Sequence, residues 1–408
     1  MRYCFIMANS RLGYFNIEKV FSDVGSNTRF VLIVAKQFLN HVPENFKKCM
    51  FCILPIDEVK FELCKEGIES LKVNPNELSM SCIACTDEKS LITAAELREH
   101  FDMNGTRVYQ HVPFSSKRIM KQVLSICGVN VPKFVDFDGK NTKTALSEYH
   151  CYLKNLFGGS YVVKPLDGGG SADTAIVKDY PNLLNWYNNF YSNADSYTAE
   201  EFIGGTFYHC DSFVVNKEAK FAAVFEYLYP NLDFTFGKAI GGFPLLRNSE
   251  LSNRALQFNN EVIKALEPPD GALHLEFFIK DQKIVFIEIG ARPGGKTIVL
   301  CHEKNSGINL YEYTLRHELK LPLEFNIKEN PFHSWVSLAK SPGIVKKLNV
   351  PVLNSKADID WKIKIGDKIE SFPSSLKDGV AADIILFNPD YDKLIEDVNI
   401  LRTHKAYL

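Results

Sequence analysis

Two glutamates on neighbouring predicted strands constrain this chain more than any other feature of its sequence. The apolar runs GALHLEFFIKD and KIVFIEIGAR have the length of strands and meet at Asp281-Gln282, which predicts a β-hairpin. A hairpin register places Glu276 and Glu288 side by side on one face of the pair. Adjacent carboxylates among apolar residues repel each other unless a cation lies between them, and oxygen ligands of this kind favour Mg²⁺. The sequence therefore predicts a magnesium site at this hairpin.

Further residues indicate that the magnesium site faces a phosphate. Lys164 ends a predicted strand, and Arg292 follows the hairpin in the constrained loop GARPGG. Glycines let backbone amides approach a phosphate, a lysine adds a point charge, and an arginine suits an oxyanion or a phosphoryl group. Taken singly, these features are typical of a flexible turn or a surface salt bridge, but together they predict a nucleotide–metal site. The glycine-rich loop after Lys164 consists of Gly168, Gly169, Gly170 and Ser171.

The charge balance limits the classes of ligand. The chain has 408 residues with 47 Lys and Arg against 49 Asp and Glu, a net charge of -2. No overall field attracts nucleic acid or an anionic membrane, so any phosphate must be bound by a local site. No apolar run approaches the roughly 20 residues that span a bilayer, and the start lacks a signal-peptide pattern. We expect a cytoplasmic protein whose partners are small molecules.

The ten cysteines include two pairs with the CxxC spacing of zinc ligands, Cys49/Cys52 and Cys82/Cys85. Each pair lies within an apolar run that resembles a buried strand, where residues three apart point to opposite faces. We therefore interpret these cysteines as small buried hydrophobic residues in a reducing compartment, with a zinc site as the alternative.

The order of the predicted elements divides the chain into four parts. Residues 1–112 alternate short apolar strands with helices, which predicts a Rossmann-like parallel sheet without a Gly-x-Gly-x-x-Gly turn. The loop after the first strand, from Ala8 to Gly13, could bind a ligand, although a structural role is the simpler interpretation. Helices and a strand–loop–strand unit fill 113–195, long β-runs and a helix fill 196–330, and 331–408 predict a β-rich unit closed by a helix. The fold class is thus α/β combined with α+β.

Residues from about 116 to 300 resemble the ATP-grasp superfamily, and the pattern HLEFF…IEIGARPGG is most similar to its carboxylate–amine ligase branch, which includes bacterial L-amino acid (dipeptide) ligases. The resemblance implies a Rossmann-like N-terminal domain, a two-lobed ATP clamp and a C-terminal β-rich unit. It implies ATP and Mg²⁺, as two ions, with Glu276 and Glu288 as metal ligands. It also implies roles for Arg292 and Lys164 in catalysis and a homodimer formed through the N-terminal domain.

The resemblance further assigns the residues that contact ATP. It implies that Lys117 and Lys164 bind the nucleotide, and that the loop from Gly168 to Ser171 covers its phosphates. It implies that a hinge segment binds adenine, and this segment consists of Glu200, Glu201, Phe202 and Ile203.

Two positions depart from the family pattern. Phe207 stands where many members have a glutamate for the ribose, and Gly290 stands where many have an asparagine near the metal. Ribose must then be held by another residue, and the candidates are Tyr208, His209 and Asp211.

His274 lies two residues before Glu276 and shares its strand face, so we expect it to point into the same cleft. A contact with substrate or phosphate and a satisfied core histidine are equally compatible with the sequence. For His209 and Asp211, which share a face of the strand after the hinge, a polar sheet face is an equally compatible interpretation. The expected activity is ligation of a carboxylate to an amine through an acyl phosphate, with release of ADP. Two alternatives stay open, a ligase that loads an amino acid onto the thiol of a carrier protein and a catalytically silent nucleotide-binding module.

Overall fold

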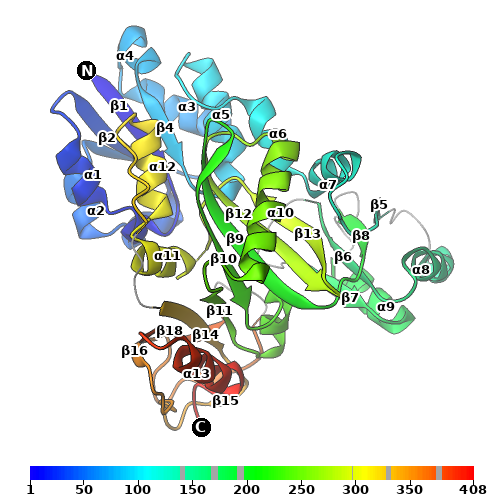
Figure 1. Ribbon diagram of the computed structural model, residues 1–408. Helices are drawn as coiled ribbons and strands as arrows, with labels where there is room; N and C mark the ends of the chain where they lie inside the picture. Colours follow the sequence, from blue (N-terminus) through cyan, green and yellow to red (C-terminus); the bar gives the residue numbers. More distant parts are fainter. Residues whose placement is uncertain (138–142, 167–172, 191–196, 296, 328–331, 374–378) are drawn as a thin grey trace.

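The structure is a computed structural model that describes residues 1–408 apart from 138–142, 167–172, 191–196, 296, 328–331 and 374–378. Its N-terminal part is a parallel sheet with strand order β3-β2-β1-β4 and helices on both faces (Figure 1). This arrangement confirms the Rossmann-like prediction. The strands are β1 (Arg2–Met7), β2 (Thr28–Ala35), β3 (Cys52–Ile56) and β4 (Cys82–Cys85).

Both faces of this sheet are buried, which explains why its strands are continuous apolar runs. Cys4 and Ile6 point into one core and Phe5 and Met7 into the other. Side chains from α1 (Ile17–Asp23), α2 (Glu44–Cys49) and α12 (Leu310–Glu318) fill the first core. Side chains from α3 (Phe61–Ser70), α4 (Pro75–Ser79) and α5 (Leu91–His100) fill the second. Because α12 comes from far along the chain, the N-terminal sheet is completed by a later segment.

The cysteine prediction is wrong in one respect. Cys49 is the last residue of α2 and Cys52 the first of β3, so this pair does not lie within one strand. The segment before Cys49 forms a short helix whose apolar side packs on the sheet, and the chain turns before the strand begins. Cys82 and Cys85 both lie in β4, as predicted. In the part of the chain that the structure describes, no cysteine belongs to a group that could hold a metal ion.

The connection to the next unit consists of α6 (Val108–Ser115) and α7 (Lys117–Ile126). A smaller sheet follows, with antiparallel strand order β5-β8-β6-β7. Two helices, α8 (Lys143–Phe157) and α9 (Tyr180–Phe190), contribute to its core, and we call this unit the small lobe. Its strands are β5 (Phe134–Asp136), β6 (Tyr161–Pro165), β7 (Ala175–Val177) and β8 (Tyr197–Glu201).

The largest sheet has eight antiparallel strands in the order β13-β12-β9-β10-β11-β14-β18-β16. Helices α7 and α10 (Glu250–Leu266) pack on one face of its first half, and α11 (Ile298–Ser306) packs on the opposite face. We call the first five strands of this sheet, from β13 to β11, together with these helices, the large lobe. Its strands are β9 (Thr206–Val215), β10 (Glu218–Tyr227), β11 (Ile240–Pro244), β12 (Gly271–Lys280) and β13 (Lys283–Gly290).

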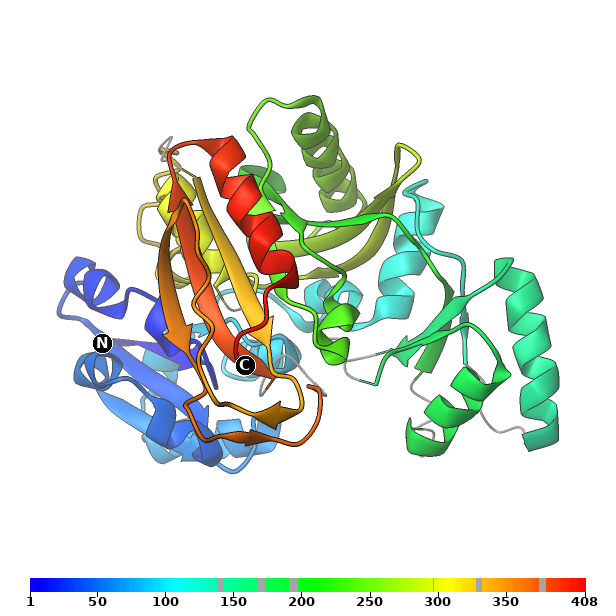
Figure 2. The same cartoon turned by 90° about the horizontal axis from the view of Figure 1, so that it is seen from below.

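The C-terminal strands continue the same sheet, because β11 pairs with β14. Figure 2 shows this β-rich end beneath α13 (Tyr391–Thr403), whose apolar side chains pack with those of β14 and β18. A short pair, β15 (Gly343–Ile344) with β17 (Lys368–Ile369), lies outside the main sheet. The three strands that extend the sheet are β14 (Phe332–Ala339), β16 (Lys356–Trp361) and β18 (Val380–Asn388). Across the described residues, no helix combines the length and apolar character needed to cross a lipid bilayer.

The β12–β13 hairpin has the turn that its sequence predicts. Asp281 and Gln282 have φ values of 48° and 64°, the paired left-handed conformation of a two-residue hairpin turn. The turn pairs Lys280 with Lys283, and continued without interruption this register would place Glu276 opposite Ile287. An irregularity between Glu276 and Phe277 shifts the register by one residue and makes Glu276 and Glu288 direct partners. The predicted pairing of the two glutamates is therefore confirmed.

Candidate active site

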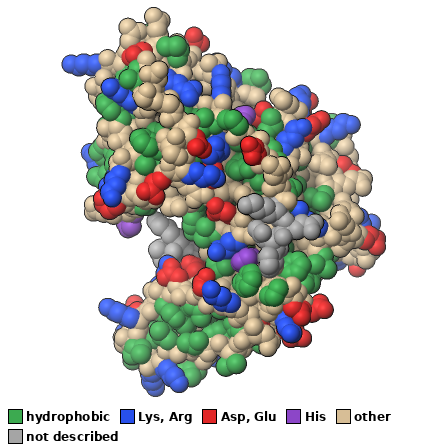
Figure 3. Space-filling model, turned by 60° about the vertical axis from the view of Figure 1, so that its left-hand side comes forward, with side chains coloured by type: hydrophobic (Ala, Val, Ile, Leu, Met, Phe, Trp, Pro, Cys, Tyr) green, Lys and Arg blue, Asp and Glu red, His purple; other side chains and the backbone are tan. Residues whose placement is uncertain are grey.

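The N-terminal sheet and both lobes border one cleft of about 2410 Å³. Figure 3 shows the hollow between the upper and lower parts of the molecule. One wall is formed by loops at the carboxyl ends of the parallel strands, where ligands of open α/β sheets commonly bind. The other walls come from β6 and β8 of the small lobe, from the β12–β13 hairpin, and from the C-terminal strands.

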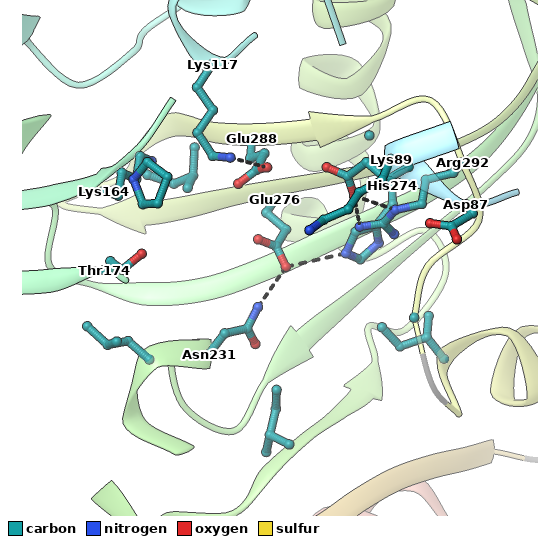
Figure 4. Close-up of a pocket in the computed structure, with 18 of the residues that line it drawn as sticks. Asp87, Lys89, Lys117, Lys164, Thr174, Asn231, His274, Glu276, Glu288 and Arg292 are labelled. Atoms are coloured by element: carbon teal, nitrogen blue, oxygen red, sulfur yellow. Dashed lines mark hydrogen bonds and ion pairs between the residues drawn. The ribbon is translucent and has the colours of Figure 1, made fainter. Parts of the chain in front are cut away.

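The carboxylates of Glu276 and Glu288 lie on the same wall of this cleft (Figure 4). Glu276 Oε1 accepts hydrogen bonds from the Tyr227 hydroxyl and from Asn231 Nδ2, both at 2.9 Å. His274 Nε2 lies 3.4 Å from the same oxygen. Burial by itself raises the pKa of Glu276, but the hydrogen bond and charge of His274 outweigh it and lower that pKa. Glu276 is thus held as an anion, the state that a metal ligand requires.

Three lysines approach the hairpin from the opposite side. Lys117, at the start of α7, places its Nζ 3.2 Å from Glu288 Oε1. Lys164 Nζ lies 2.9 Å from Glu200 Oε2, and Lys121 Nζ lies 2.7 Å from Glu200 Oε1. Lys117 and Lys121 are four residues apart on one helix, and so both reach the same region.

Glu200 therefore holds two cations at once in a buried position. Its burial favours the neutral acid, but Lys121 and Lys164 outweigh that effect and lower the pKa of Glu200. Burial lowers the pKa of Lys121 to about 8, although Glu200 partly offsets it. For Lys164 burial acts in the same direction, yet the nearby carboxylates of Glu200 and Glu288 outweigh it and raise the pKa. Lys164 stays cationic while facing the cleft.

Arg292 leaves the hairpin and reaches the N-terminal domain. Its Nε and Nη2 lie 2.7 Å and 2.6 Å from Glu88 Oε2, and its Nη1 donates to the Pro293 carbonyl at 2.9 Å. Burial opposes its charge, but Glu88 outweighs that effect and raises the pKa of Arg292. This permanent cation lies where the β12–β13 hairpin meets the N-terminal domain, close to His274 and Asp87 in Figure 4.

A buried histidine cluster lies behind His274. Asp211 Oδ1 is 2.9 Å from His274 Nδ1, and Asp211 Oδ2 is 2.5 Å from His209 Nδ1 and 2.9 Å from His302 Nε2. Burial alone lowers the pKa of His274, but Asp211 and Glu276 raise it to about 9. A Cβ at Gly294 would lie 2.6 Å from Asp211 Oδ1, so the GARPGG loop approaches this cluster only because glycine occupies that position.

The structure brings most of the predicted site residues together. Lys117, Lys164, Glu276, Glu288 and Arg292 all line the cleft. The remaining predicted residues that do so are His274, Glu200, Glu201, Phe202 and Ile203. The predicted phosphate loop, Gly168 to Ser171, lies outside the described residues.

The candidates for ribose binding do not reach the cleft. Asp211 is fully buried against three histidines and does not line the cleft, so the structure gives no support to the prediction that it binds ATP. His209 belongs to the same cluster, and the Tyr208 hydroxyl donates to Glu226 at 3.0 Å on the opposite face of the sheet. The ring of Phe207 lines the cleft instead and stacks on Tyr227 at 4.9 Å between centroids.

Sequence reasoning missed Glu88, Lys121, Tyr227 and Asn231. Lys121 had a usable signal, its spacing of four residues from Lys117 on a predicted helix. Glu88 follows the last strand of the parallel sheet, the edge at which ligand-binding residues gather. Tyr227 and Asn231 carried no local signal, because their contact with Glu276 depends on the pairing of distant strands.

Comparisons with known proteins place a family model on the central part of the chain. Residues 114–296 match the ATP-grasp domain family. The L-arginine-specific L-amino acid ligase of Bacillus subtilis is 27% identical to this chain over 286 residues. That match covers 67% of this chain and 65% of the relative, slightly less than two thirds of the relative's length.

Solved structures share the fold over nearly the whole chain. The crystal structure of an L-amino acid ligase from Bacillus licheniformis has a TM-score of 0.70 at 16% identity, covering 98% of this chain and 97% of that one. A carboxyaminoimidazole ribonucleotide synthase from Aspergillus clavatus, in complex with ATP, has a TM-score of 0.70 at 13% identity and the same coverage. The chain thus contains a segment, residues 114–296, that matches the ATP-grasp domain family, and over nearly its whole length it has a fold similar to that of an L-amino acid ligase.

Proposed function

We propose that this protein is an ATP-dependent ligase that activates the carboxylate of an amino acid as an acyl phosphate and joins it to an amine. One observation carries the proposal: Glu276 and Glu288 stand side by side in a cleft that also holds Lys117, Lys164 and Arg292. Paired carboxylates facing several cations suit the transfer of a phosphoryl group better than they suit simple binding. The relationship to L-amino acid ligases supports the choice of amino acids as substrates.

The chemistry of the site fits a magnesium ion at the hairpin. Glu276 and Glu288 offer hard oxygen ligands. Tyr227 and Asn231 both donate to Oε1 of Glu276, so neither of them contacts its Oε2. Bound there, Mg²⁺ would neutralise charge on the phosphates of ATP and of the transferring phosphoryl group.

The reaction proceeds in two steps. An oxygen of the acid attacks the γ-phosphorus of ATP, the bond to the β-phosphate oxygen breaks, and ADP leaves. The amine then attacks the acyl carbon, inorganic phosphate leaves, and the amine proton passes to solvent. Lys117 and Lys164 bind the phosphates, and Arg292 stabilises the oxyanion of the second step. His274, held between Asp211 and Glu276, contributes a contact to phosphate or substrate.

The decisive experiment is a screen for release of ADP and phosphate over pairs of amino acids, with each acid and each amine also supplied alone. We expect both products only when a pair is present, and a ligated product of the summed mass less water. A Glu288→Gln variant should lose turnover by about 100-fold or more, because it removes one metal ligand. Formation of AMP and pyrophosphate, or unchanged turnover in that variant, contradicts the proposal. A mass gain on a carrier protein in place of an amine product would favour a thiol ligase.

A further inference from the structure

The N-terminal wall of the cleft carries a guanidinium that the proposed reaction does not yet use. Arg11 lies in the loop after β1 and lines the cleft. Its Nη1 donates to the Tyr311 hydroxyl at 3.3 Å. Among the residues that the structure describes, no carboxylate lies within ion-pair distance of Arg11.

The backbone and a neighbouring glycine both fix the place of this side chain. Arg11 has φ 65° and ψ 17°, a left-handed conformation that a non-glycine residue adopts only at a cost of about 1 kcal/mol or more. A Cβ at Gly295 would lie 3.2 Å from Arg11 Nη2. The guanidinium therefore packs against the GARPGG loop, three residues beyond Arg292, because glycine leaves room for it.

Lys89 also lines this wall, and two of the carboxylates there already have partners. Glu88 pairs with Arg292, and Asp87 accepts a hydrogen bond from Asn9 at 3.2 Å. The nucleotide end of the cleft has its own cations, Lys117 and Lys164. Arg11 is thus a separate positive group, positioned for a second anion.

The size of the cleft leaves space for that anion. Its volume of about 2410 Å³ exceeds the ~300–1,000 Å³ of ordinary ligand sites. When an amino acid with a single carboxylate is activated, the negative charge of the acyl phosphate lies on its phosphoryl group, which the proposed reaction places at Lys117 and Lys164, and no free carboxylate is left for Arg11. The amine substrate keeps its carboxylate throughout the reaction.

We propose that Arg11 binds the carboxylate of the amine substrate, so that this substrate is an α-amino acid rather than a simple amine. A planar guanidinium pairs with a carboxylate through two parallel hydrogen bonds, which orients the ligand as well as holding it. When the carboxylate of the amine substrate is bound at Arg11, the amino group of that substrate is directed along the GARPGG loop toward Arg292. This inference rests on the proposed function, because it assigns one of that reaction's substrates.

The test compares Arg11→Asn with wild type on an amino acid pair and on the same pair with the amine substrate as its carboxamide. Asparagine tolerates the left-handed backbone, so the loop conformation is retained. Loss of a charged hydrogen bond predicts a KM for the amino acid amine that rises roughly 10- to 100-fold. The KM values for ATP and for the acid should stay within about twofold of wild type. The carboxamide should be an equally poor substrate of wild type and of Arg11→Asn.

Lys72→Asn provides the matched control. Lys72 is an exposed cation in the same domain with φ 51°, and it does not line the cleft. This variant makes the same change of charge on the same kind of backbone, and we expect wild-type kinetics. The inference would be overturned if Arg11→Asn raised the KM of the acid as much as the KM of the amino acid amine. It would also be overturned if that variant raised the KM of the carboxamide as much as that of the amino acid amine.

A binding measurement separates this inference from the proposed function. Calorimetric titration of the amino acid into wild type and Arg11→Asn, with a non-hydrolysable ATP analogue present, reports the carboxylate site without turnover. If no pair releases ADP but binding still depends on Arg11, the proposed function fails and the carboxylate site stands. If ADP is released and Arg11→Asn changes neither KM nor binding, the carboxylate site fails alone.

Discussion

Glu200 shows how a single buried side chain can govern the charge of a site. Its two oxygens bind Lys121 and Lys164, and all three side chains are buried. A buried carboxylate between two lysines holds both ammonium groups in defined positions, and only Lys164 of this pair lines the cleft. The resemblance implies that Glu200 contacts adenine. The two ion pairs show that it also positions Lys121 and Lys164.

Replacing Lys121 by methionine should destabilise the protein by about 3 kcal/mol, because it leaves Glu200 buried with half of its positive charge. The ATP KM should also rise, since Glu200 then competes more strongly for Lys164. Urea unfolding and ADP release measure the two effects. Lys217→Met removes an exposed ion pair with Glu267 and should change stability by less than about 0.5 kcal/mol. Equal stability of the two variants would show that the buried pair contributes nothing.

The buried charge of Asp211 provides a second test of how a single residue stabilises the protein. Asp211→Asn keeps the shape but removes the charge that faces three histidines, and a broken buried network of this kind costs about 3–5 kcal/mol. Urea unfolding checks the value. Asp281→Asn, at the exposed hairpin turn, is the control, because asparagine also accepts a left-handed backbone. A variant at position 211 as stable as this control would mean that the cluster is not ionic.

A buried histidine in helix α6 should make the stability of the folded protein depend on pH. Its His111 is buried, and Nε2 lies 2.7 Å from the Thr106 hydroxyl. Burial, together with the charge of Arg98, lowers the pKa of His111 to about 4 from its ordinary 6.5. The folded protein then binds fewer protons than the unfolded chain between pH 6.5 and 4, so stability is full above pH 6.5 and falls as the pH drops through that window.

His111→Gln removes this titration. Between pH 7 and pH 4.5, wild type should lose roughly 2 kcal/mol more than the variant in urea unfolding. Parallel pH profiles of the two proteins would show that the imidazole takes up its proton without opening α6.

The elements that local chemistry determines were the ones the sequence predicted well. The β12–β13 hairpin follows from two turn residues between apolar strands, and Glu276 and Glu288 are partners as expected, although their pairing also depends on a register shift after Glu276 that the sequence did not predict. Cys49 shows the limit of such reasoning, because a short helix and a strand meet within one apolar run and look alike in the sequence. The partners of Asp211 could not be predicted, since His302 comes from a helix some ninety residues further along.

Long-range pairing also sets the organisation of the whole molecule. The predicted C-terminal unit, 331–408, does contain the expected strands, but β14 joins β11 and extends the sheet of the large lobe. Similarly, α12 lies within the predicted large lobe, 196–330, yet its side chains complete a core of the N-terminal sheet. The division into four parts remains a prediction about folding units, and neither contact has a signature in sequence.

The continuity of the cleft has a consequence for the order of events in time. Lys117, Lys164, Arg292 and Arg11 border one space, so the ATP, acid and amine of the proposed reaction can all be bound before any product leaves. Initial-velocity plots should therefore give lines that intersect when the amine is varied at several fixed concentrations of the acid. Parallel lines would mean that a first product departs before the amine arrives. In the intersecting case the amine is bound before any product leaves, so the acyl phosphate forms next to its nucleophile.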